Sequence, residues 1–381
     1  MNERDVHALR QRLTESLARA GEFGQDWMRA AFERVARHAF APDEVWVWDE
    51  GVGGWASVER REEPDRWAEL VYGDAALVTQ VDDGNTRSGA GALGREATSS
   101  ISAPGAVVNM LAALDPRPGE RVLEIGTGSG YNAALLCERV GDRGVTSVEI
   151  DPVLFRCSIQ ALCAVGYRPH VVLGDGEAGW PAGAPYDRLI STASVRRVPP
   201  AWLEQVRPGG VIVTPWFPNY HGRGLIRLRM RGDGTARGGF CGGETFMPVR
   251  GQRVRPLDVG GVWAATHDRA ERIPGAAPDL RDLDAHGEFA LSVRLPGVGC
   301  YRQEPDGWFF LAGDNSAWAR IAGADTYRYG DRDLLAEVAA AVRWWRENGR
   351  PRLSAYTVTA TRDRQTIRLH DSEAPPAGTI C

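Results

Sequence analysis

Apolar residues at steps of three and four predict two amphipathic helices at the start of the chain. The first is expected over residues 5–20, and the second from Asp26, which could cap it, to about Arg37. Residues 42–65, rich in Trp, Glu and Gly, are expected to form a loop, and residues 81–99, full of Gly, Asp, Ser and Asn, to be the most flexible stretch. The apolar faces of the two helices are Val6, Leu9, Leu13 and Leu17 in the first, and Trp27, Ala31 and Val35 in the second.

The centre of the chain alternates short apolar runs with segments of helical period. Strands that alternate with helices at this spacing form a mostly parallel sheet with helices on both faces. The sequence therefore predicts an α/β fold for this part of the chain. The predicted strands are 121–125, 145–149, 170–173, 189–192 and 211–215, and the predicted helices are 131–140, 152–165 and 201–206.

The last third of the chain has a different pattern. Residues 224–249 have the pattern of antiparallel strands with Gly-rich turns, and residues 251–290 are rich in loops. These features predict two domains, one over residues 1–252 and a smaller α+β domain over residues 253–381. In the smaller domain the predicted strands are 290–295, 308–311, 354–361 and 365–370, and the predicted helix is 331–347.

Composition narrows the class of protein. Of the 381 residues, 43% are hydrophobic and 25% are charged, which is the balance of a globular protein and not of a disordered one. The sequence holds no apolar run of about 18 residues, the length that a membrane-spanning helix needs. No signal-peptide pattern follows Met1, so we expect a cytoplasmic protein without a membrane partner. The six Cys form no CxxC pair, which predicts free thiols and no metal site.

The charged residues exclude several kinds of chemistry. All 45 basic side chains are Arg, and the formal net charge is −5. Without Lys the chain has no amine to form a Schiff base with pyridoxal phosphate, and it lacks the Lys of a Walker A loop. The slightly acidic balance also argues against a nucleic-acid partner.

The strongest candidate motif is the Gly-rich segment EIGTGSGY, from Glu124 to Tyr131. It lies between a predicted strand and a predicted helix, where glycines permit a tight turn and a close approach to a ligand. Free backbone N–H groups at the start of the helix add to such a site. The spacing is G-x-G-x-G, with Tyr131 where a dinucleotide fingerprint has a small residue, so it favours S-adenosylmethionine over NAD. The alternative is an ordinary structural turn.

Acidic residues follow the next two predicted strands. Glu149 ends the strand about twenty residues after the Gly-rich segment, where an acid binds ribose hydroxyls. Asp175 and Gly176 follow the third strand and would lie near an adenine. The alternatives are a strand-terminal Glu on the surface and a simple Asp-Gly turn. Because the carboxyl ends of parallel strands meet at one edge of a sheet, we expect these residues to share a site with Glu124, whose partner stays open.

Seven segments of the sequence resemble the protein-L-isoaspartate O-methyltransferases, a family of class I methyltransferases. The resemblance covers about residues 10–250 and is most detailed in the segment VLEIGTGSGYNAALL. It implies the α/β fold of class I S-adenosylmethionine-dependent methyltransferases, to which this chain would add its C-terminal α+β domain. The segments are 34–42, 72–77, 100–104, 122–136, 174–187, 198–210 and 246–249.

The resemblance also implies roles for individual residues. The active-site Ser of the family falls on Ser102, whereas His38 is interpreted as structural. A carboxylate substrate is ionised at neutral pH and needs no general base, so the enzyme must chiefly orient its oxygen, which a Ser hydroxyl can do. Alternatively, Ser102 caps the following helix, with Pro104 in its first turn. The implied binding residues for S-adenosylmethionine, released as S-adenosylhomocysteine, are Ile101, Ser102, Glu124, Gly126, Thr127, Gly128, Gly130, Glu149, Asp175 and Gly176.

Three departures from the family pattern concern the substrate. The stretch between Asp74 and Ser102 is longer than in the family, and Gly105 and Ala106 stand where the family has bulky residues. In addition, residues 253–381 extend beyond the resemblance. An enlarged rim and an extra domain favour one preferred peptide over many damaged proteins.

A second resemblance, carried by residues 313–319 and 344–351, is to actinobacterial homologues that tailor ribosomal peptides, the lanthipeptides or graspetides. Those enzymes methylate an Asp side chain, and the ester cyclises to a succinimide (aspartimide), which persists or opens to isoaspartate. We therefore expect a carboxyl O-methyltransferase that acts on Asp in a modified precursor peptide. The alternative is a repair enzyme for isoaspartyl residues of damaged proteins. A binding module that recognises a leader peptide without turnover is disfavoured by the intact Gly-rich segment and Glu149.

Overall fold

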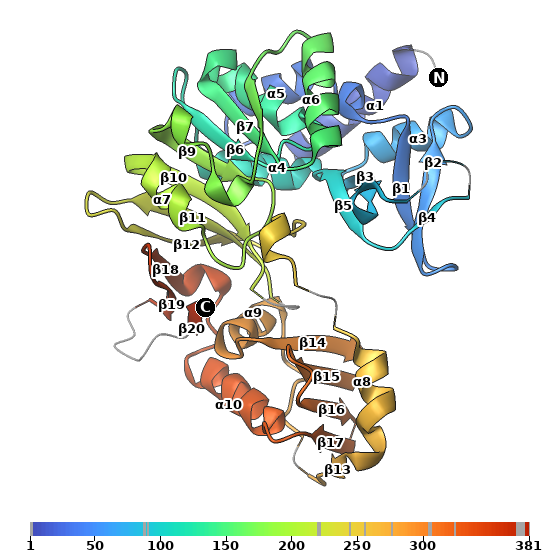
Figure 1. The fold of residues 1–381 in the computed structure, drawn as a ribbon, viewed down its shortest axis with the longest axis vertical. Helices are drawn as coiled ribbons and strands as arrows, with labels where there is room; N and C mark the ends of the chain where they lie inside the picture. Colours follow the sequence, from blue (N-terminus) through green and yellow to red (C-terminus); the bar gives the residue numbers. More distant parts are fainter. Residues whose placement is uncertain are drawn as a thin grey trace. The chain divides into compact units, whose positions relative to one another are not determined.

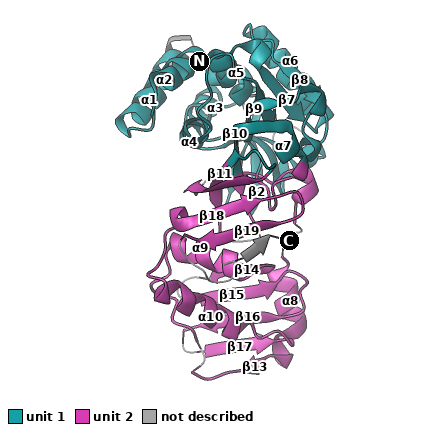
Figure 2. Cartoon of the chain, turned by 90° about the vertical axis from the view of Figure 1, so that its left-hand side faces the viewer, with its two compact units in different colours: residues 1–193, 201–214, 229–234 teal, residues 194–200, 215–228, 235–381 magenta. Residues whose placement is uncertain are grey.

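The computed structural model contains two compact units, whose elements are labelled in Figure 1. Unit 1 comprises residues 1–193, 201–214 and 229–234, and unit 2 comprises residues 194–200, 215–228 and 235–381 (Figure 2). The predicted domain boundary after residue 252 stays a prediction. The structure describes residues 3–86, 89, 91–218, 222–243, 245–254, 257–275, 277–303, 307–323, 325–370 and 378–380.

Two helices begin unit 1, as the apolar pattern predicted. Helix α1 spans Glu3–Arg19 and helix α2 spans Asp26–Arg34, followed by a short 3-10 helix, η1, at Arg37–Phe40. Leu13 and Leu17 of the first helix are buried. Asp26 is the first residue of α2, and the cap position falls on the residue before it.

An antiparallel sheet follows in the order β4-β2-β1-β3-β5, where the sequence predicted a loop and a flexible stretch. Its polar side chains bond one another: the Thr98 hydroxyl donates to Gln80 at 3.0 Å, and the Thr79 hydroxyl to Ser99 at 3.2 Å. Polarity here therefore marks a bonded sheet rather than a mobile loop. The strands are β1 (Glu44–Asp49), β2 (Gly54–Glu59), β3 (Leu77–Val81), β4 (Leu93–Gly94) and β5 (Ala97–Ile101), with helix α3 (Pro64–Val71) and the 3-10 helix η2 (Asp82–Gly84) between them.

The predicted parallel sheet is confirmed and forms the centre of unit 1. Its strands lie in the order β10-β9-β6-β7-β8, and the central strand β6 is buried at every position, which explains its continuous apolar run. The strands are β6 (Val122–Ile125), β7 (Val145–Glu149), β8 (His170–Leu173), β9 (Tyr186–Ser191) and β10 (Val206–Trp216). The helices are α4 (Pro104–Leu114), α5 (Tyr131–Val140), α6 (Pro152–Ala164) and α7 (Pro200–Gln205).

Five consecutive strands of a ten-stranded sheet, in the order β20-β19-β18-β12-β11, come from segments that are far apart in the sequence. β12 pairs antiparallel with β18, and β18 with β19. Its aromatic core includes Phe240, Phe289 and Tyr356, with the ring centroids of the two Phe 4.7 Å apart. The strands are β11 (Gly224–Met230), β12 (Ala236–Gly242), β18 (Tyr356–Ala360), β19 (Gln365–Leu369) and β20 (Gly378–Ile380).

The predicted strand at residues 290–295 is wrong, because this segment belongs to helix α9 (Ala285–Arg294). The Asp284 side chain caps the helix by accepting from the backbone N–H groups of His286 and Gly287. The helix buries Phe289 and Leu291, so its apolar run is a helix face packed in the core rather than a strand.

A second antiparallel sheet of unit 2 has the order β13-β17-β16-β15-β14. Trp318 is fully buried in its core, where its ring stacks with Phe309 at 5.4 Å between centroids. The predicted helix near 331–347 and the strand at 308–311 are confirmed. The elements are α8 (Val259–Thr266), β13 (Glu271–Arg272), β14 (Val298–Gln303), β15 (Gly307–Ala312), β16 (Trp318–Ala322), β17 (Asp325–Tyr329) and α10 (Leu334–Glu347).

Short 3-10 helices connect several elements: η3 (Asp142–Gly144), η4 (Gly176–Ala178), η5 (Pro181–Gly183), η6 (Arg250–Gln252), η7 (His267–Arg269) and η8 (Leu353–Ala355). Within the described ranges, no helix is long and apolar enough to cross a bilayer. The same residues contain no group of three or more His, Cys, Asp or Glu that could hold a metal ion.

Candidate active site

The Gly-rich loop, residues 126–130, connects β6 to α5 and is held against the neighbouring strand β7. The backbone N–H groups of Gly126 and Thr127 both donate to the carbonyl of Val148, at 2.9 and 3.3 Å. Gly126 has φ +87°, and a Cβ there would lie 2.9 Å from the Thr192 hydroxyl. The turn therefore needs glycine at this position, for conformation and for space.

Glu149, at the end of β7, ties this loop to the next turn. Its carboxylate accepts from the N–H of Gly128 at 2.8 Å and from the N–H of Asp151 at 2.9 Å. Burial raises the pKa of Glu149, and the backbone N–H donors oppose that rise. Each carboxylate oxygen has two lone pairs, so the group keeps acceptor capacity for a ligand hydroxyl. Only 6% of Glu149 is exposed, which rules out the alternative of a surface Glu.

Glu124, in β6, lies beneath the loop and is completely buried. Its carboxylate accepts from Asn132 at 2.7 Å and from the Ser147 hydroxyl at 2.5 Å, and Ser147 also contacts the Thr127 hydroxyl at 2.6 Å. Burial raises the pKa of Glu124 to about 7, against the effect of these two donors. The hydrogen-bond partners of Glu124, which the sequence left open, are thus protein groups, and through Ser147 they connect Glu124 to Thr127 of the loop.

The turn after β8 packs against the end of β6. The Asp175 carboxylate accepts from the N–H of Glu177 at 2.9 Å, as in the alternative of an Asp-Gly turn, and the side chain is exposed. A Cβ on Gly176 would lie 2.4 Å from the Ile125 side chain, so only glycine fits this approach. The N–H of Gly174 donates to the carbonyl of Glu149 at 2.8 Å. The ends of β6, β7 and β8 therefore meet at one edge, as predicted.

Ser102 follows β5 and is half-buried, whereas Ile101 before it is 2% exposed. The alternative that Ser102 caps the next helix is wrong, because the cap residue of α4 is Ala103, without a side-chain cap bond. The Ser102 hydroxyl makes no hydrogen bond with any residue that the structure describes. A Cβ built on Gly128 would lie 3.8 Å from the carbonyl of Ser100, so the end of β5 approaches the Gly-rich loop.

Arg37, in η1, supports the backbone around Ser102 and was not identified from the sequence. It is 1% exposed, and its guanidinium donates to the carbonyls of Ser102 at 2.7 Å, Ala75 at 3.1 Å and Ile101 at 3.3 Å. Its carbon lies 5.6 Å from the centroid of the Tyr131 ring. Arg37 thus connects the segment before Ser102, the segment at Ala75 and the first residue of α5.

The electrostatic setting of Arg37 is unusual. Burial lowers its pKa to about 10, opposed by Tyr131 and Asp74, and its Nε is a buried donor without a partner in the described part of the chain. Among the described residues no carboxylate lies within ion-pair distance of it. The available signal was a single Arg within the short apolar segment 35–40, which also lies inside a segment that carries the family resemblance.

Two further contacts hold the segments beside Ser102. The Asp74 carboxylate accepts from the N–H of Gly105 at 2.9 Å, at the start of α4. His38 Nδ1 lies 2.5 Å from the Tyr72 hydroxyl, and burial, with Arg60 and Arg10 nearby, lowers the pKa of His38. This bond occupies His38 within the fold, which agrees with the structural interpretation.

Comparisons with known proteins agree with this architecture. Residues 55–254 match the family model described as protein-L-isoaspartate(D-aspartate) O-methyltransferase. The relative from Methanopyrus kandleri named protein-L-isoaspartate O-methyltransferase is 34% identical over 246 residues, which are 64% of this chain and 92% of that protein. Protein-L-isoaspartate O-methyltransferase 1 of Archaeoglobus fulgidus is 50% identical over 162 residues, covering 42% of this chain and 73% of that protein.

A solved structure titled protein-L-isoaspartate O-methyltransferase has the same fold along nearly the whole chain. It covers 95% of this chain and 99% of its own, with a TM-score of 0.53 and 18% identity. The predicted fold class, a class I α/β methyltransferase fold with an additional C-terminal α+β part, is therefore confirmed.

Proposed function

The chain belongs to the protein-L-isoaspartate(D-aspartate) O-methyltransferase family, and on this premise we propose that it methylates the side-chain carboxylate of an isoaspartyl residue in a peptide or protein. The methyl donor is S-adenosylmethionine. The observation that carries the proposal is the Ser102 hydroxyl, which bonds no described residue and lies on a loop beside the Gly-rich turn of this family's sheet. The protein is thus an enzyme, a carboxyl O-methyltransferase, rather than a peptide-binding module.

The residues at the edge of the parallel sheet suit S-adenosylmethionine, whose sulfonium group supplies the methyl. In this proposal Gly126, Thr127, Gly128 and Gly130 form the turn that the cofactor approaches, and Glu149 accepts from ribose hydroxyls with its remaining lone pairs. Asp175 and Gly176 flank the base. Glu124 acts from below through Asn132 and Ser147, and the buried Ile101 fixes the backbone before Ser102.

Ser102 is the proposed catalytic residue. Because an isoaspartyl carboxylate is ionised at neutral pH, no base has to remove a proton before attack. The Ser102 hydroxyl donates to one carboxylate oxygen and so directs the other toward the methyl group. Arg37 holds the Ser102 carbonyl and positions this hydroxyl.

The second candidate is methylation of an ordinary Asp in a modified precursor peptide, with cyclisation of the ester to a succinimide. The resemblance of residues 313–319 and 344–351 to peptide-tailoring homologues favours it. However, a solved structure titled protein-L-isoaspartate O-methyltransferase shares this fold over 95% of the chain, so an extra C-terminal part does not point to tailoring by itself. The names of the relatives support the isoaspartyl substrate better.

Mass spectrometry with two matched peptides tests the proposal. One peptide carries isoaspartate before Gly, the other Asp before Gly, and both are incubated with S-adenosylmethionine. We expect a gain of one methyl group on the isoaspartyl peptide alone. Methylation or loss of water on the Asp peptide alone, including a crosslinked precursor, would overturn the proposal in favour of tailoring. Heat-inactivated enzyme is the control for spontaneous succinimide formation.

A further inference from the structure

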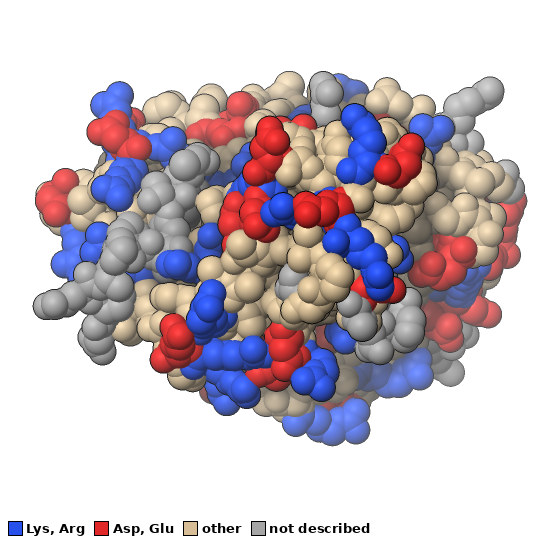
Figure 3. All heavy atoms as spheres, turned by 90° about the horizontal axis from the view of Figure 1, so that it is seen from below, with Lys and Arg blue, Asp and Glu red and all other residues tan. Residues whose placement is uncertain are grey.

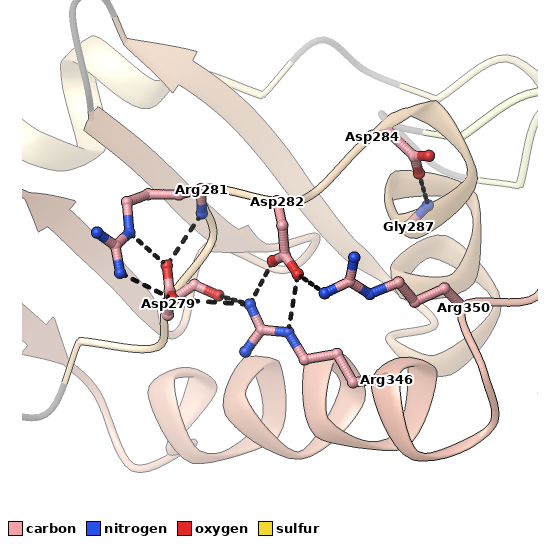
Figure 4. A network of polar contacts seen from close by, with 7 residues as sticks. All are labelled: Asp279, Arg281, Asp282, Asp284, Gly287, Arg346 and Arg350. Carbon is pink, nitrogen blue, oxygen red and sulfur yellow. Dashed lines mark hydrogen bonds and ion pairs between the residues drawn. The ribbon is translucent and has the colours of Figure 1, made fainter.

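Several arginines of unit 2 are paired with acids. Asp282 binds both Arg346 and Arg350, and Asp279 binds Arg281, in the network of Figure 4. Further pairs are Arg272 with Asp325, Arg328 with Glu271 and Asp333, and Arg332 with Glu337. Acidic and basic side chains lie side by side on the face seen in Figure 3. In these parts of unit 2 the positive charges are locally neutralised.

Two other arginines lie on one face of the sheet formed by β12, β18 and β19. Burial alternates along these strands, with Tyr356, Val358 and Ile367 buried on the inner face. The outer positions form two rows across the sheet. The first row is Arg237, Thr359 and Thr366, and the second is Gly239, Thr357 and Arg368.

Among the described residues, the outer positions of these three strands carry two positive charges and no acidic side chain. Arg237 and Arg368 are exposed, and within the described ranges neither makes a hydrogen bond or an ion pair. The outer positions of the three strands hold only Arg, Thr and Gly, with Cys241 at one end.

We propose that this sheet face is a docking surface for an extended, acidic segment of the polypeptide substrate. Two arginines without acidic partners can each bind a carboxylate through two parallel N–H groups. The Thr359 and Thr366 hydroxyls add donors beside Arg237, whereas the Thr357 hydroxyl already bonds His370 Nδ1 at 2.6 Å. The inference rests on the proposed function only in that the substrate is a polypeptide.

The spacing of the two arginines defines the segment. They lie two strands apart and one row apart, which puts their Cα atoms about 12 Å from each other in a regular sheet. An extended peptide advances about 3.3 Å per residue, and its alternate side chains point to the same side. Acidic residues at positions i and i+4 of an extended segment match this geometry. A nucleic acid fits less well, because two cations neutralise few phosphates of a strand.

Fluorescence anisotropy with labelled octaglutamate, without cofactor, tests the proposal. The double variant Arg237→Glu with Arg368→Glu removes the surface charge. Its matched control is Arg343→Glu with Arg352→Glu, which changes two exposed arginines of unit 2 and shifts the net charge equally. We expect affinity to fall at least about tenfold in the first variant and less than about twofold in the control, at an ionic strength of about 50 mM.

Three results would overturn the proposal: equal losses in both double variants, no loss in either, or tighter binding of a single-stranded oligonucleotide that depends on the same two arginines. Circular dichroism melting of both variants excludes unfolding as the cause. With isoaspartyl peptides, we expect the first variant to raise KM for a Glu-flanked peptide but not for a Gln-flanked one, with kcat unchanged. If no peptide is methylated, the proposed function is refuted, but the anisotropy result can still be interpreted because it needs no turnover.

Discussion

Ser102 is the residue whose proposed role can be tested most directly. Replacing it with Ala removes a donor to a charged oxygen, worth about 1.5–3 kcal/mol, which corresponds to a fall in kcat of roughly 10–150-fold. We expect this loss in Ser102→Ala, with little change in the affinity for S-adenosylmethionine by calorimetry. Ser100→Ala, a half-buried Ser two residues earlier in the chain, is the matched control. Undiminished methylation by Ser102→Ala would remove Ser102 from the mechanism.

Two substitutions of Arg37 can distinguish the effect of its charge from the effect of its hydrogen-bond geometry. Arg37→Met leaves three carbonyls without their donor, and we expect it to lower the free energy of unfolding by about 2–4 kcal/mol and to lower kcat. Arg37→Lys keeps the charge but loses the fork of N–H groups, so it should recover part of the stability and little of kcat. Denaturant unfolding and kinetics on the isoaspartyl peptide measure the two effects. Full kcat in Arg37→Lys would show that the fork does not position Ser102.

Glu124 gives the protein a specific pH dependence of stability. Its pKa is about 7 in the folded protein because burial disfavours the charged form, against the ordinary value of 4.5 in the unfolded chain. Between these two pH values the folded state therefore binds one more proton than the unfolded state. The stabilisation from this proton, about a few kcal/mol, is fully present below pH 4.5 and is lost as the pH rises to about 7. Glu124→Gln should flatten the pH dependence of the unfolding midpoint in this window. An unchanged profile would show that Glu124 does not titrate there.

At the scale of elements, one carboxylate holds together the two ends of a turn within residues 81–99, the stretch that the sequence predicted to be the most flexible. The Asp82 side chain accepts from the N–H groups of Arg95 and Glu96 and from the Thr86 hydroxyl. Although partial burial acts in the opposite direction, these donors lower the pKa of Asp82. The contribution of the group is therefore present above its unfolded pKa and is lost as pH falls through the folded value.

Asp82→Ala should loosen β4 and β5 without melting unit 1. Losing a carboxylate that caps backbone N–H groups costs about 0.5–2 kcal/mol. We expect faster hydrogen exchange at the amides of Arg95 and Glu96, measured by NMR or mass spectrometry, and unchanged exchange in β6. Asp83→Ala, one residue along, is the control. If the amides of Arg95 and Glu96 stay as protected from exchange as in the wild type, the strands are stable without the Asp82 carboxylate.

An element could be predicted from the sequence when the residues that signal it lie within the element or in the turn next to it. Strand β6 and helix α5 were placed correctly, because a buried parallel strand reads as an apolar run and the glycines mark its turn. Helix α9 was mistaken for a strand, because a short apolar run fits both periods and its cap, Asp284, lies outside the run. Arg37 was missed because its partners are carbonyls, which carry no signature in the side-chain sequence.

At the scale of the whole molecule, strand pairing bears on the predicted boundary after residue 252. β12 lies before that boundary, yet it pairs with β18, and Phe240 packs against Phe289. A fragment of residues 1–252 would expose this strand edge and lose the packing of a buried Phe, which costs roughly 3–5 kcal/mol. We expect the fragment to aggregate or to melt well below the full chain by size-exclusion chromatography and calorimetry. A monomeric fragment of equal stability would support an independent domain ending at 252.

The pairing of β12 with β18 also has a consequence during synthesis. The two strands are separated by roughly a hundred residues, which include the whole second sheet of unit 2. At about 5–20 residues per second, β12 leaves the ribosome on the order of ten seconds before its partner exists. For that interval the nascent chain presents an open strand edge and an uncovered aromatic ring, Phe240, so chaperone contact should peak between the emergence of β12 and that of β18.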